Sequence, residues 1–114
     1  MRELQKQRLA VLREIADMVK VRQEAGNATP MDVLTAERDV ITAELELCAS
    51  DKERVEVLER AVALEKQLED LIAQQYRAGV GPGSPAEVLR VKARRLQVEI
   101  DLEKAKARLA APAK

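Results

Sequence analysis

The stretch Val21-Arg22-Gln23-Glu24-Ala25-Gly26-Asn27-Ala28-Thr29-Pro30-Met31-Asp32-Val33-Leu34 decides the fold of this chain. Gly26 suits the left-handed position that follows a helix, because it lacks a Cβ atom. Thr29 suits the N-cap of a following helix, and Pro30 suits its first position, where a missing N–H costs nothing. We therefore predict that one helix ends just before Gly26 and that another begins just after Thr29.

The same pattern occurs a second time. Gln74-Gln75-Tyr76-Arg77-Ala78-Gly79 aligns with the residues before the first turn, and Pro85-Ala86-Glu87-Val88-Leu89 aligns with the residues after it. Ser84 or Gly83 is placed to cap the later helix. The chain is thus an internal duplication, and each copy is predicted to be an antiparallel hairpin of helix, glycine turn and helix.

The residues between the two turns leave two architectures open. The segment 30–78 has no internal glycine or proline, and a heptad step runs through Leu34, Ile41, Cys48, Val55 and Val62. By contrast, Ser50-Asp51-Lys52-Glu53 has the spacing of a capping box, which would start a new helix and give four helices, as in a bundle. The unbroken heptad phase makes one long, bent helix the preferred interpretation. Both alternatives give an all-α fold of two tandem helical hairpins, a single domain over 1–114 with repeats at about 4–49 and 57–110.

Apolar residues indicate which helix faces pack. The first helix is expected to bury one stripe, made of Leu4, Val11, Met18 and Ala25 with Leu12, Ile15, Val19 and Arg22. The last helix, 85–110, has two stripes well apart around its axis: Leu89, Ala93, Leu96, Ile100 and Ala107 on one side, and Val91, Val98, Leu102, Ala105 and Leu109 on the other. A helix with two apolar sides needs neighbours on both. We therefore predict a homo-oligomer, most simply a dimer.

The composition excludes most of the residue sets that enzymes use for catalysis. The chain has no histidine and a single cysteine, Cys48, which excludes a histidine general base, a histidine-ligated metal and a multi-cysteine zinc site. The net charge is zero and aromatic residues are 1%, which disfavours nucleic-acid binding by bulk charge or base stacking. No apolar run approaches the roughly 20 residues that cross a bilayer. We predict no enzymatic activity, no cofactor or metal, no nucleic-acid partner and no membrane span.

Three features that could carry chemistry are interpreted as structural. Cys48 is expected to act as a small buried hydrophobe. The carboxylates at 44–46 and 99–103 are expected to form solvated faces, because residues two apart on a helix do not face each other. The basic residues Arg90, Lys92, Arg94 and Arg95 are expected to form a salt-bridged surface.

At its turns the chain resembles the outer membrane efflux (TolC-like) family. Hairpins of that family carry Tyr-x-x-Gly, a short polar loop and Asp-Val-Leu-x-Ala. Here residues 76–79 supply the first half and residues 32–36 the second. In that family this turn lies at the periplasmic tip of an α-barrel and meets an adaptor protein. The resemblance implies partner-docking tips at Gly26, Asn27, Thr29, Tyr76, Gly79, Val80, Gly81 and Ser84.

The resemblance also implies a non-enzymatic role in export, with a periplasmic adaptor as partner and a periplasmic or outer-membrane-associated location. The chain departs from the family pattern at Gln23, where the family has tyrosine, and at the Gly81-Pro82-Gly83 insertion. It has no strand that alternates like a lipid-facing one, so it is not expected to form a pore by itself. The sequence shows no signal peptide, which leaves a cytoplasmic location open. The alternative function is a coiled-coil scaffold or oligomerisation domain whose turns only reverse the chain.

Overall fold

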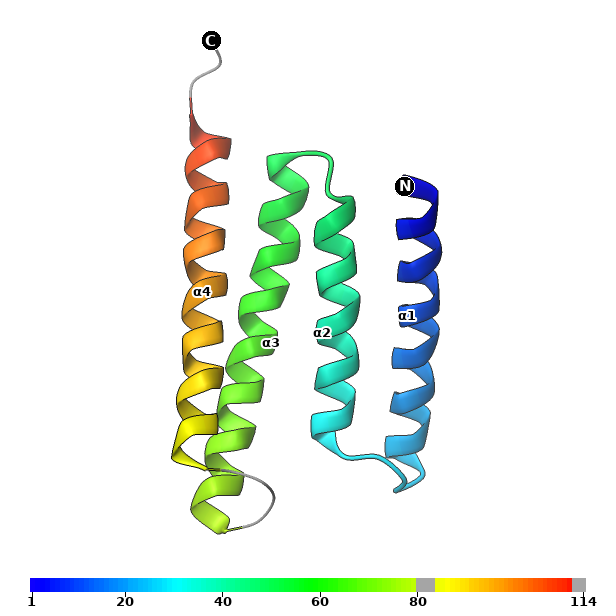
Figure 1. Ribbon diagram of the computed structural model, residues 1–114, viewed down its shortest axis with the longest axis vertical. Coiled ribbons are helices and arrows are strands. Elements are labelled where there is room, and N and C mark those ends of the chain that lie inside the picture. Colours follow the sequence, from blue (N-terminus) through cyan, green and yellow to red (C-terminus); the bar gives the residue numbers. More distant parts are fainter. Residues whose placement is uncertain (80–83, 112–114) are drawn as a thin grey trace. The chain divides into compact units, whose positions relative to one another are not determined.

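A computed structural model describes residues 1–79 and 84–111, and over these residues the chain forms helices and short turns, with no strand (Figure 1). The helices are α1 (Arg2–Glu24), α2 (Pro30–Leu47), α3 (Asp51–Ala78) and α4 (Pro85–Ala110). The helices contact each other in sequential pairs, α1 with α2 and α3 with α4, within two compact units, Met1–Ser50 and Asp51–Lys114. The predicted all-α fold of two helical hairpins is confirmed.

The preferred interpretation of one long helix between the turns is wrong, because the helix breaks after Leu47. Cys48 has extended backbone angles (φ −62°, ψ 127°), which no helix continues through. Its Sγ donates to the Glu44 carbonyl at 3.4 Å and so satisfies a backbone oxygen that the helix end leaves unpaired. α3 then begins at Asp51, the position that a capping box over 50–53 predicts. Cys48 is half-buried at this helix end and is not a fully buried residue of a continuous helix.

The first hairpin covers only part of the stripe expected on α1, and its centre lies on a neighbouring row. Leu9 and Ala16 are the buried residues of α1, and Leu12 and Val19 beside them are half-buried. By contrast, the expected heptad row is exposed, with Leu4 at 66% and Met18 at 64%. The reason is that α1 carries two adjacent rows with the same three-and-four spacing, and α2 covers only the one through Leu9 and Ala16. The other row, called here the second row of α1, consists of Leu4, Arg8, Val11, Ile15 and Met18.

The last helix has the two apolar sides that the sequence predicts, and only one of them is covered. Its buried residues are Val91, Leu102 and Ala105, all from one predicted stripe. Leu89 (64% exposed), Leu96 and Ile100, from the other stripe, face solvent. This exposed row, called here the second row of α4, consists of Leu89, Ala93, Leu96, Ile100, Glu103 and Ala107. Each hairpin thus has one helix with an apolar row that its partner helix in the hairpin does not cover.

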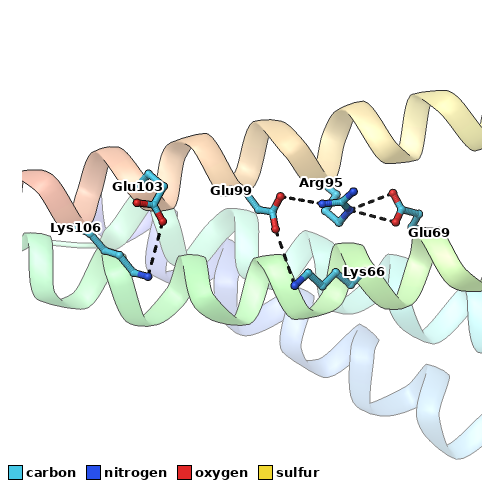
Figure 2. A network of polar contacts seen from close by, with 6 residues as sticks. All are labelled: Lys66, Glu69, Arg95, Glu99, Glu103 and Lys106. Carbon is cyan, nitrogen blue, oxygen red and sulfur yellow. Dashed lines mark hydrogen bonds and ion pairs between the residues drawn. The ribbon is translucent and has the colours of Figure 1, made fainter.

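The second hairpin contains a layer of charged residues between its helices (Figure 2). The Arg95 guanidinium of α4 donates to both carboxylate oxygens of Glu69 on α3, at 3.1 and 3.2 Å, and to Glu99 at 2.8 Å. Lys66 lies 3.9 Å from the second Glu99 oxygen. The hydrogen bonds that Arg95 donates to Glu69 are the main cause that raises the pKa of Arg95 above its ordinary value. One turn away along α3, Glu65 is 3% exposed and pairs with Arg94 at 3.6 Å.

Candidate functional site

The first candidate tip is a tightly specified turn. Gly26 has φ +80°, as predicted for the residue after the helix end. Its N–H donates to the Gln23 carbonyl at 3.0 Å, and the Asn27 N–H donates to the Arg22 carbonyl at 2.7 Å. These two bonds form a Schellman motif, which satisfies the carbonyls that the end of α1 leaves unpaired. Asn27 itself is exposed.

The start of α2 is fixed by a reciprocal capping box between Thr29 and Asp32. The Thr29 hydroxyl accepts from the Asp32 N–H at 3.1 Å, and the Thr29 N–H donates to the Asp32 carboxylate at 2.9 Å. The Thr29 backbone bond is the largest cause that holds the pKa of Asp32 below its ordinary 3.8. The predicted cap at Thr29 with Pro30 at the first helical position is confirmed. The tip residues Gly26, Asn27 and Thr29 are therefore held in one geometry.

The capping box predicts a pH-dependent contribution to the stability of the first hairpin. Because the pKa of Asp32 is lower in the folded chain, this contribution is complete above 3.8 and is lost as the pH falls through the lower folded-state pKa. Asp32→Ala should therefore melt below wild type at neutral pH, with a difference that shrinks on acidification. Thermal unfolding followed by circular dichroism measures this. Thr35→Ala, an exposed change on the same helix, is the control, and its difference from wild type should not vary with pH.

The second candidate tip has two features of the first: a glycine with positive φ after one helix and a side-chain cap at the start of the next. Gly79 has φ +69°, and its N–H donates to the Tyr76 carbonyl at 3.2 Å. Ser84 caps α4, and its hydroxyl accepts from the Glu87 N–H at 3.2 Å. The Glu87 carboxylate forms an ion pair with Arg90 at 2.7 Å. The aligned Asp32 carboxylate of the first repeat instead accepts the Thr29 N–H. Tyr76 is 45% exposed close to the end of α3. The predicted tip residues Val80 and Gly81 lie outside the described residues.

A hollow of about 390 Å³ lies beside the first tip, between α1 and α2. Its lining mixes aliphatic side chains with charges of both signs: Ile15, Val19, Arg22, Asn27, Ala28, Asp32, Thr35, Ala36 and Asp39. Two of its lining residues on α2, Thr35 and Ala36, are small, whereas the aligned residues of the second repeat are the larger Arg90 and Val91. Sequence reasoning missed this hollow. The difference in side-chain size between the repeats was the signal that could have found it.

The charged groups elsewhere pair with each other. Arg90, Arg94 and Arg95 each lie in an ion pair, as predicted for a salt-bridged surface. Glu99 is half-buried in the charged layer, so the prediction of a solvated face is wrong at that residue. Within 1–79 and 84–111, no group of acidic and cysteine side chains gathers as metal ligands do. The helices of this part of the chain are each too polar or too short to cross a bilayer.

No protein-family model matches the chain, and no similar protein was found among curated proteins or solved structures.

Proposed function

We propose that this chain is a non-enzymatic helical-hairpin module that binds other proteins through its tips, in the manner of the periplasmic hairpins of efflux channels. One observation carries the proposal: the first turn is fixed at both sides, by the Schellman motif at Gly26 and the capping box at Thr29, and it adjoins a hollow. Any helical turn satisfies its helix ends in this way, but a turn that only reversed the chain would not need a concave surface beside it. Pre-organisation of this kind lowers the entropy cost of binding.

The chemistry of the hollow suits an aliphatic side chain of a partner helix. Ile15, Val19 and Ala36 provide apolar surface, while Arg22 supplies a cation and Asp39 a carboxylate at the rim. The hollow is open and mixed in character, with an aliphatic patch beside five polar or charged residues, so it offers one partner side chain both apolar contact and polar groups. The proposed partner is a periplasmic adaptor protein, and this assignment rests on the resemblance of the turns to the efflux family. Export is accordingly the proposed process, and the periplasm the proposed location.

The test compares two threonine-to-arginine variants on α2. Thr35→Arg introduces the residue that the second repeat has at this position, which fills the hollow. Thr42→Arg makes the same change one heptad further along, at an exposed residue outside the hollow. With a purified periplasmic adaptor from the same organism as titrant, Thr35→Arg should weaken binding at least about tenfold, while Thr42→Arg should bind like wild type. Equal affinity of both variants, or no binding by wild type, would contradict the proposal.

A second candidate function, a scaffold that assembles copies of itself, is favoured by the two exposed apolar rows. Large side chains such as Leu4, Met18 and Leu89 are more than 60% exposed in the single chain. Isolated exposed apolar residues are ordinary, but a row at heptad spacing along a helix is the pattern of a helix–helix seam. In this function the turns only reverse the chain, and the exposed rows bind other copies of the chain.

A further inference from the structure

The second rows of α1 and α4 match each other in spacing. Along α1 the steps between successive residues of the row are four, three, four and three, from Leu4 to Met18. Along α4, read backwards from Ala107 to Ala93, the steps are the same. Two helices with this spacing pack as an antiparallel coiled coil, in which each layer joins one residue from each helix. The antiparallel register that overlaps the rows fully places Val11 opposite Ile100 and Ile15 opposite Leu96.

The charges within the rows select this pairing over the alternatives. In the register of full overlap, Arg8 of the α1 row falls opposite Glu103 of the α4 row. A shift of one heptad in either direction places Glu103 opposite an apolar residue or beyond the end of the row. Antiparallel pairing of the α1 row with itself leaves Arg8 opposite an apolar residue, and parallel self-pairing places it against its own copy. In these self-pairings Arg8 gains no carboxylate from the facing helix, so both alternatives are disfavoured.

Both charged residues are able to form the new pair. Arg8 donates through one terminal nitrogen to Glu46 at 3.1 Å, and a guanidinium has five N–H donors, so it can serve a second carboxylate. Glu103 lies 3.9 Å from Lys106, with its side chain 76% exposed (Figure 2). The carboxylate is thus accessible for a stronger partner.

We propose that the second row of α1 binds the second row of α4 of another copy, antiparallel, in the register that pairs Arg8 with Glu103. The pairing is between unlike surfaces, so every copy has one row of each kind to offer, and assembly closes at two copies or at a larger ring. This inference deepens the scaffold function, and its α1 row shares one residue, Ile15, with the hollow beside the first tip.

Disulfide trapping between two single-cysteine variants tests the register. In a Cys48→Ser background, Val11→Cys is mixed with Ile100→Cys and oxidised. Facing positions of a coiled-coil layer lie within the Cβ separation that a disulfide needs. The mixture should form a covalent dimer at least about tenfold faster than either variant alone. It should also exceed a mixture of Val11→Cys with Ala93→Cys, which lies one heptad away.

Other occupants of the rows give different results and would overturn the proposal. Rapid crosslinking of Val11→Cys alone would show that the α1 row pairs with itself. If the mixture stayed unlinked while a Val11→Cys/Ile100→Cys double variant closed within one chain, the rows would pair intramolecularly. As a second measurement, Ile100→Glu should weaken self-association about a hundredfold, whereas Leu109→Glu, equally exposed but outside the row, should not. Thr35→Arg should leave crosslinking unchanged, which separates this test from that of the tips.

Discussion

An Arg95→Ala variant should unfold at a temperature lower by on the order of 5 °C or more. Arg95 is 17% exposed in the second hairpin and donates to both Glu69 and Glu99. Removing it leaves the Glu69 carboxylate, itself 24% exposed, without the Nε–H donor that its two oxygens share. A partly buried charge that loses its partner is more destabilising than the original pair was stabilising. Thermal unfolding followed by circular dichroism gives the change in melting temperature.

The matched control replaces three charged residues of this region with the apolar residues that the first repeat has at the aligned positions. The positions aligned with Glu65, Glu69 and Arg95 are occupied there by Leu12, Ala16 and Val40. The triple variant Glu65→Leu/Glu69→Ala/Arg95→Val should therefore melt at or above the wild-type temperature, because apolar contacts take the place of desolvated charges. The account of this layer is wrong if Arg95→Ala melts like wild type, or if the triple variant is less stable than Arg95→Ala.

A Gly26→Val variant should lose about 1–2 kcal/mol of unfolding free energy. Gly26 has φ +80°, and a Cβ atom added there meets nothing within 4 Å. The cost is therefore backbone strain and not crowding, and it is largest for a β-branched residue. Gly26→Asn is the matched control, because asparagine tolerates the left-handed region and should retain more of the stability. Urea unfolding of both variants measures the difference, and equal stability would show that the turn does not need its glycine.

The helix ends were predictable because their chemistry is local. Gly26 and Thr29 specify the first turn through backbone conformation and one side-chain oxygen, and Gly79 and Ser84 do the same in the second. These effects depend on residues within one turn of helix, so the sequence contains all of the information. The ends of α4 were accordingly predicted to the residue.

The break at Cys48 and the packing face of α1 were not predictable from periodicity. The heptad spacing continues in the same phase on both sides of residues 48–50, and no glycine or proline marks the break there. In α1, the rows through Leu4 and through Leu9 have the same spacing. The choice between them depends on where α2 lies, which is tertiary information. The ion pairs of Arg94 and Arg95 were predicted, but their partners on α3 depend on how the two helices pack, which is also tertiary information.

We propose that another copy of the chain covers the second rows of α1 and α4. Sedimentation equilibrium of the wild-type protein over a range of concentrations measures whether copies associate. The expected molar mass is a multiple of 12.7 kDa that falls toward that value only on dilution. A mass of one chain at every concentration would contradict association through these rows.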